Sequence, residues 1–142
     1  SSSVQTISNA MDVGNPSNFE RILDLFHHSF DKVKDAIIGY YFTDVETKSA
    51  MRLMYSKFNY IVDPHGAVGY LGLMNYLNSH SEKKGVFLGT AHPAKFLNVV
   101  KPTLNTDIKI PKKLQSFMMM KKKSVQILNL YENFKNQILE KK

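Results

Sequence analysis

Apolar positions along the chain follow a helical period in several blocks, and short apolar runs separate these blocks. Ser17 and Glu20 form a capping box, in which each side chain accepts a backbone amide hydrogen of the first turn. The stripe that follows continues to Ile37, and Gly39 ends it, so we expect one helix over this stretch. A second capping box, Thr43-Asp44-Val45-Glu46, predicts another helix. The inner face of that helix is expected to consist of Ala50, Met51, Met54, Tyr55 and Phe58.

A third helix is expected to begin at Asp63-Pro64. Asp is a favoured N-cap residue and Pro is favoured at the first helical position. The stretch "HGAVGYLGLMNYL" is apolar nearly all round, which is typical of a buried helix. Its glycines recur at three-residue intervals and allow a neighbouring element to approach closely; they are Gly66, Gly69 and Gly72.

Four short apolar runs, residues 4–7, 40–42, 60–62 and 85–88, are predicted to be strands. Strands that alternate with helices predict an α/β fold, with a few-stranded parallel sheet flanked by helices. Few strands can be counted, so we expect further strands upstream of the chain. An unpaired sheet edge tends to recruit another chain, so the fragment is expected to self-associate.

The end of the chain is predicted to be a helical tail. One helix is expected from Lys112 to about Lys121 and a second, amphipathic helix from Ser124 to the end. The apolar stripe of the second helix consists of Ile127, Leu130, Tyr131, Phe134 and Ile138. We therefore expect a single unit over residues 1–142, with an α/β part over about 1–106 and the tail over about 107–142.

The amino-acid composition excludes several classes of protein function. The 142 residues are 43% hydrophobic and include no cysteine, which excludes disulfides, thiolate metal sites and cysteine nucleophiles and fits a cytoplasmic protein. No apolar run is long enough to span a membrane, and the first residues do not resemble a signal peptide. The net charge is +7, but only two of the basic residues are arginines. We therefore interpret the lysine runs as solvated helix ends and expect no nucleic-acid partner.

The main candidates for ligand contacts lie in "GVFLGTAHPAKF", residues 85–96. An apolar run ends there at Thr90, and Pro93 then opens a helix. Ligands of open α/β sheets bind at the carboxyl ends of strands, so the Thr90 hydroxyl is a candidate ligand contact. An equally good alternative is that Thr90 or His92 caps the helix. Lys95, one turn further on, could contact a phosphate or a carboxylate.

His65 and His92 both lie near predicted helix starts. A metal pair is conceivable, but there is no HExxH motif and no nearby acid other than Asp63. Capping or packing roles are favoured, and no metal is expected. His27 and His28 lie off the apolar stripe of their predicted helix and are expected at the surface.

Four blocks of the sequence resemble the C-terminal part of threonine synthases. They are "AMDVGNPSNFERI", "TDVETKSAM", "DPHGAVG" and "GTAHPAKF", and they occur in that family's order. The resemblance covers most of residues 6–101. It implies a partial large domain of the pyridoxal-phosphate (PLP) enzymes of the tryptophan-synthase β fold type. It also implies an enzyme that converts O-phospho-L-homoserine and water to L-threonine and phosphate.

The resemblance further implies roles for individual residues. In the family, the threonine of TAHPAKF contacts the pyridine nitrogen of PLP, and that residue is Thr90 here. His92, Lys95 and His65 become near-site residues. The Schiff-base lysine belongs to the family's upstream part, so Lys95 is not that lysine, and this chain alone is expected to be inactive and not to hold the cofactor.

Relatives often carry threonine in "DPHTAVG" where this chain has Gly66. Two alternatives remain at this point. The chain could belong to another PLP lyase of the same fold type, or it could be a non-enzymatic α/β binding module with a basic tail.

Overall fold

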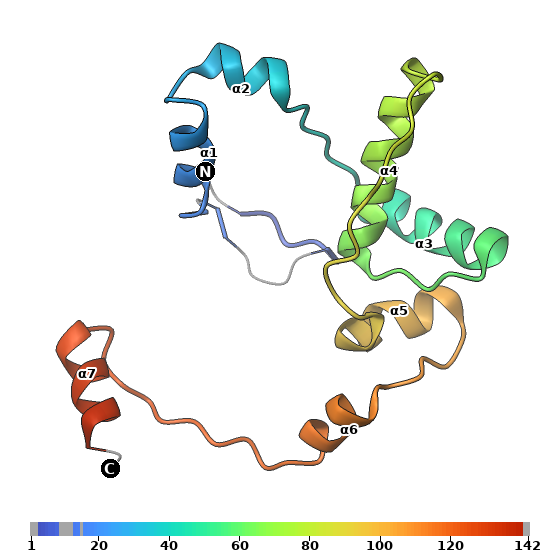
Figure 1. Ribbon diagram of the computed structural model, residues 1–142. Coiled ribbons are helices and arrows are strands. Elements are labelled where there is room, and N and C mark those ends of the chain that lie inside the picture. The colour runs from blue at the N-terminus through green and yellow to red at the C-terminus, as the bar shows by residue number, and fades with distance from the viewer. Residues whose placement is uncertain (1–2, 9–12, 15, 141–142) are drawn as a thin grey trace. The chain divides into compact units, whose positions relative to one another are not determined.

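The computed structural model describes residues 3–8, 13–14 and 16–140 (Figure 1). Within these residues the chain forms seven α-helices and one 3-10 helix, and it contains no strand. It divides into two compact units, Ser1–Lys109 and Ile110–Lys142.

Three helices of the first unit surround its core. They are α3 (Asp44–Phe58), α4 (Pro64–Ser79) and α5 (Leu97–Leu104), and the 3-10 helix η1 (Pro93–Phe96) leads directly into α5. Helix α3 packs on both α4 and α5. The buried apolar cluster consists of Ala50, Met51, Met54, Val62, Ala67 and Val100.

The start of α3 is as predicted. The Glu46 amide donates to the Thr43 hydroxyl at 3.3 Å, and the Glu46 carboxylate accepts from the Thr43 amide at 2.7 Å. The reciprocal bonds of the capping box are therefore both present. Ala50, Met51 and Met54 are buried on the predicted inner face, whereas Phe58 is exposed.

The start of α4 is also as predicted, with Asp63 as the N-cap and Pro64 in the first turn. Burial is less extensive than the sequence indicates, because only Pro64, Gly66 and Ala67 of this helix are buried. The glycines do allow close approach. A Cβ atom on Gly72 would lie 3.4 Å from the Tyr40 ring.

The predicted helix from Ser17 to Gly39 is wrong as one element. The structure has two short helices, α1 (Phe19–Leu25) and α2 (Phe30–Ala36), separated by His27 and His28. Both histidines have φ of 54°, in the left-handed region that a right-handed helix cannot contain. They are exposed, as expected.

The capping box at Ser17 is also absent. The N-cap of α1 is Asn18, which is itself in the right-handed helical region and makes no capping hydrogen bond through its side chain.

The predicted few-stranded parallel sheet is wrong for the residues that the structure describes. Residues 4–7, 40–42, 60–62 and 85–88 all lie outside helices, but none is assigned to a strand. A strand requires backbone hydrogen bonds to a neighbouring strand, and apolar runs in the sequence do not supply that neighbour. In Figure 1 the chain after α4 turns back and runs alongside that helix instead.

The second unit contains α6 (Lys112–Met118) and α7 (Tyr131–Leu139). Residues 121–128 lie outside helices between them, so α7 begins seven residues after the predicted start at Ser124. The predicted stripe residues Ile127 and Leu130 therefore precede α7. The stripe residues Tyr131, Phe134 and Ile138 lie within α7 and are exposed.

Candidate functional site

The turn before η1 carries three of the predicted site residues. His92 is the N-cap of η1, and its Nδ1 atom accepts a hydrogen bond from the Ala94 amide at 3.1 Å. The Thr90 side chain is exposed and makes no hydrogen bond within the described part of the chain. Of the two capping alternatives, His92 is therefore the capping residue, and the Thr90 hydroxyl remains available to a ligand.

Lys95 lies on the solvent side of η1. Its amide donates to the His92 carbonyl at 2.9 Å, which closes the first turn of the 3-10 helix. Its side chain is exposed, and within the described residues its ammonium makes no ion pair. The exposed ammonium can therefore reach an anionic group near the turn.

His65 is oriented by a buried carboxylate. Asp63 is 1% exposed, and its oxygens accept from the His65 amide at 3.2 Å, the Gly66 amide at 3.3 Å and the His65 ring nitrogen Nδ1 at 2.8 Å. The carboxylate can only accept, so Nδ1 is the donor of this bond, and Nε2 makes no hydrogen bond within the described residues. The ring can present that atom in one fixed orientation.

Phe96 connects His65 to η1. The two ring centroids lie 4.9 Å apart, and the ring planes are tilted by 54°. The first turn of α4 and the 3-10 helix that follows Thr90 are therefore in direct contact. No hydrogen bond joins His65 to Thr90, His92 or Lys95 within the described residues.

Tyr60 is a residue near the turn that sequence reasoning missed as a site residue. Its hydroxyl lies 3.6 Å from the position that a Cβ atom would take on Gly89. The residue occurs in an apolar run that predicted a strand, and nothing in that run indicates that the phenol reaches the turn before Thr90. A second hydroxyl therefore lies close to the turn.

Other kinds of site find little support in the described residues. They contain no group of three or more His, Asp and Glu side chains that could hold a metal ion. None of their helices is long and apolar enough to cross a membrane.

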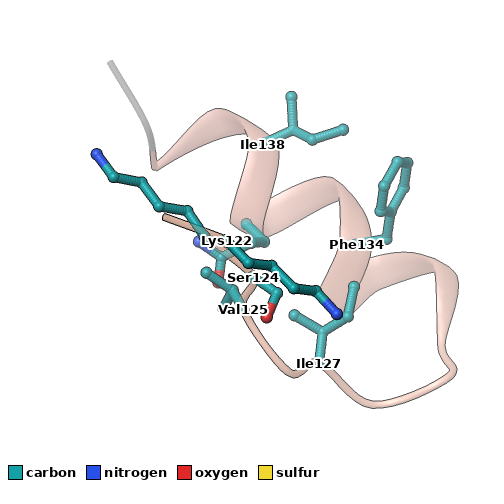
Figure 2. A pocket seen from close by; sticks show the side chains of 8 residues that line it. Lys122, Ser124, Val125, Ile127, Phe134 and Ile138 are labelled. Atoms are coloured by element: carbon teal, nitrogen blue, oxygen red, sulfur yellow. The ribbon is translucent and has the colours of Figure 1, made fainter. Parts of the chain in front are cut away.

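A separate groove of about 740 Å³ lies in the second unit (Figure 2). The close-up shows Phe134 and Ile138 on α7, and Lys122 and Ile127 on the segment before it. None of the predicted site residues lines this groove.

Comparison with known proteins gives the family. The family model described as "Threonine synthase, C-terminal" matches residues 66–138. The chain belongs to the threonine synthase family. The resemblance inferred from the four sequence blocks is therefore confirmed.

Two curated relatives illustrate the extent of the similarity. The threonine synthase of Buchnera aphidicola subsp. Acyrthosiphon pisum (strain APS) is 36% identical over 138 residues, which are 97% of this chain and 31% of the relative. The threonine synthase of Escherichia coli (strain K12) is 39% identical over 109 residues, which are 77% of this chain and 24% of the relative. The chain thus spans about a third or less of each.

Two solved structures lead to the same family. The crystal structure of E. coli threonine synthase matches with a TM-score of 0.79 and 32% identity, over 99% of this chain and 32% of that one. A PLP-bound threonine synthase from Brucella melitensis matches with a TM-score of 0.55 and 26% identity, over 84% of this chain and 30% of that one. The fold of this chain is therefore similar to that of part of the E. coli threonine synthase.

Proposed function

We propose that this chain is the C-terminal segment of a PLP-dependent lyase that converts O-phospho-L-homoserine and water to L-threonine and phosphate. The observation that carries the proposal is the match to E. coli threonine synthase over 99% of this chain. The match of the family model across residues 66–138 supports treating both units as parts of one catalytic-domain segment. The absence of cysteine fits a cytoplasmic enzyme.

Thr90 is the proposed contact to the pyridine nitrogen of PLP. Its hydroxyl is exposed beside the start of η1, and His92 already caps that helix, so the hydroxyl can donate to or accept from a ring nitrogen. Bound PLP supplies an electron sink for carbanion chemistry. A neutral hydroxyl holds the ring through a hydrogen bond and contributes no full negative charge to it.

His92, Lys95 and His65 are proposed to support the same site. His92 holds the turn in place through its bond to the Ala94 amide. Lys95 offers an exposed ammonium to the anionic groups of the substrate. His65 is held in one orientation by Asp63 and packs on Phe96 of η1.

This chain alone is proposed to be inactive and to self-associate. In the family resemblance the Schiff-base lysine lies upstream, so Lys95 does not take its role. Large apolar side chains are exposed in both units, among them Tyr41, Val86, Leu88, Phe117 and Tyr131. Such surfaces favour association with another polypeptide.

A fusion protein tests the function. The chain replaces its matching C-terminal segment in E. coli threonine synthase, and the fusion is expressed in a strain that lacks the enzyme. We expect growth without threonine, and we expect release of phosphate from O-phospho-L-homoserine by the purified fusion. The chain alone and the truncated E. coli enzyme alone are the controls, and both should fail. A folded, PLP-loaded fusion that releases no phosphate would contradict the proposal.

The role of Thr90 is tested in the same fusion. Thr90→Val leaves the ring nitrogen without its partner at a cost of about 1–3 kcal/mol, so PLP affinity should fall by roughly 5- to 150-fold. Thr90→Ser keeps the hydroxyl and should change affinity little. Because His92 caps η1, the melting temperature of the cofactor-free fusion should be the same for both variants. Unchanged PLP affinity in Thr90→Val would refute the contact.

A further inference from the structure

A cavity of about 210 Å³ in the first unit is lined by residues of both α3 and α5. Lys48 and Arg52 line it from α3, and Asn98 lines it from the first turn of α5. Residues four apart lie on one helix face, so both cationic side chains belong to the same face of α3. Among the residues that the structure describes, no Asp or Glu lines this cavity, which we call the α3–α5 cavity.

The guanidinium of Arg52 is anchored by a backbone carbonyl of α5. Its Nε atom donates to the Thr103 carbonyl at 3.1 Å, and Thr103 is 7% exposed and also lines the cavity. The two terminal nitrogens of Arg52 make no hydrogen bond or ion pair within the described residues. A guanidinium carries five N–H donors in a planar fork, so four of them remain for a ligand.

The other two polar groups of the cavity also lack partners. Within the described part of the chain, neither the Lys48 ammonium nor the Asn98 amide makes a hydrogen bond or an ion pair. Asp44 lies one turn before Lys48, but its Oδ1 atom accepts from the Ile7 amide at 3.1 Å and it forms no ion pair with Lys48. Like charges four residues apart on a helix repel each other. The two cations of the cavity therefore lack a counter-charge among the described residues.

We propose that the α3–α5 cavity binds a phosphate group, with Lys48 and Arg52 balancing its charge and the Asn98 amide donating to one of its oxygens. Two cations match the charge of a phosphate dianion better than that of a carboxylate, and the arginine fork fits two phosphate oxygens at once. The cavity is smaller than the roughly 300–1,000 Å³ of pockets for drug-sized ligands, so the ligand is inorganic phosphate or the phosphate end of a small ester.

This site is separate from the one proposed for the cofactor. None of Thr90, His92, Lys95 and His65 lines the α3–α5 cavity. The inference therefore does not rest on the proposed function, and a binding measurement on this chain alone tests it without any catalysis.

Isothermal titration calorimetry of the whole chain tests the binding, with inorganic phosphate and methyl phosphate as probes at constant ionic strength. The pH is held at about 8, where both probes are mainly dianions. We expect saturable binding, and we expect acetate to bind at least tenfold more weakly. Tighter binding of inorganic phosphate would identify the free ion as the ligand, and tighter binding of methyl phosphate would identify a phosphate ester. Saturable binding of neither probe, or acetate binding as tight as that of phosphate, would refute the proposal.

A charge substitution locates the site. Lys48→Gln removes a cation of the cavity that makes no hydrogen bond within the described residues, so the chain should stay folded while phosphate affinity falls at least tenfold. Lys57→Gln is the matched control, because it makes the same charge change on α3 outside the cavity, and it should change affinity less than twofold. Equal effects of the two substitutions would show attraction to a basic chain in general and would contradict a specific site.

Asn98→Asp tests the cavity without any ligand. The new carboxylate would supply the missing counter-charge, so this variant should bind phosphate at least tenfold more weakly and should melt at a higher temperature than the unchanged chain. A carboxylate in the first turn of α5 can also interact with the helix dipole, so the substitution is repeated in the Lys48→Gln background. The gain in melting temperature should be smaller there. A gain of equal size in both backgrounds, or unchanged phosphate affinity in Asn98→Asp, would overturn the proposal.

Discussion

Gly66→Ala is expected to destabilise the first unit, although alanine is a better helix former than glycine. Gly66 lies in the first turn of α4 and is buried. A Cβ atom at this position would lie 2.6 Å from Cγ2 of Val62 and 3.1 Å from Oδ1 of Asp63. The first distance is well inside the roughly 3.5–4.0 Å optimum for carbon atoms. Val62 is 2% exposed and has a stiff, β-branched side chain, so it cannot move away easily.

The expected change in the free energy of unfolding is the difference between two opposing terms. Overpacking a core of this kind costs about 1–3 kcal/mol. The gain in helix propensity from glycine to alanine is at most about 1 kcal/mol. The free energy of unfolding should therefore fall by up to about 2 kcal/mol, since the overpacking term is the larger.

Urea denaturation followed by far-UV circular dichroism measures the change, and Gly69→Ala is the matched control. A Cβ atom on Gly69 meets nothing closer than 3.9 Å, so the same substitution one turn later should raise stability by up to about 1 kcal/mol. The double variant Val62→Ala/Gly66→Ala should lose less stability than the sum of its single variants, because the smaller side chain removes the clash. If Gly66→Ala and Gly69→Ala both raise the midpoint, the packing argument is refuted.

Three further predictions concern the helix ends. Hydrogen bonds from Thr43 lower the pKa of the exposed Glu46 carboxyl. The contribution of Glu46 to stability is therefore present above the ordinary glutamate pKa and is lost as pH falls through the lowered pKa. Glu46→Gln should flatten the fall of the melting temperature at acid pH in a pH titration. Asp63→Ala removes a buried cap and the partner of His65, and urea denaturation should show a loss of about 2 kcal/mol or more, whereas Asp63→Asn should lose less. Arg52 Nε donates to the Thr103 carbonyl at 3.1 Å in the last turn of α5, so Arg52→Met should cost about 1–2 kcal/mol; a change below 0.3 kcal/mol would contradict this role.

The correct sequence predictions depend on local hydrogen bonds. The starts of α3 and α4 are specified by Thr43 and Asp63, whose side chains bond to amides within three residues. Such bonds join residues that are close in the sequence, so a local pattern can indicate them. The capping pattern at Ser17 did not form because Asn18 adopts a helical conformation and becomes the N-cap in its place.

The failed predictions depend on partners far away in the sequence or on unusual backbone angles. An apolar run such as residues 85–88 satisfies every local requirement of a strand, but pairing depends on a neighbour that the run itself does not encode. The break at His27 and His28 requires two consecutive left-handed residues, and this conformation is uncommon even for histidine, which adopts it more often than most residues do. The contact between His65 and Phe96 is tertiary, so spacing alone could place His65 near a helix start and no further.

The unpaired stretch that follows α4 also determines how the chain will be degraded. Lys83 and Lys84 stand at its beginning, are exposed, and lead into backbone that has no hydrogen-bonded partner within the described residues. Exposed connecting segments of this kind are preferred sites of proteolytic nicking. Trypsin should therefore cut here, and this cut separates a fragment with His65 from a fragment with Thr90. In a cell, the lifetime of the chain would then depend on how quickly a partner covers this stretch.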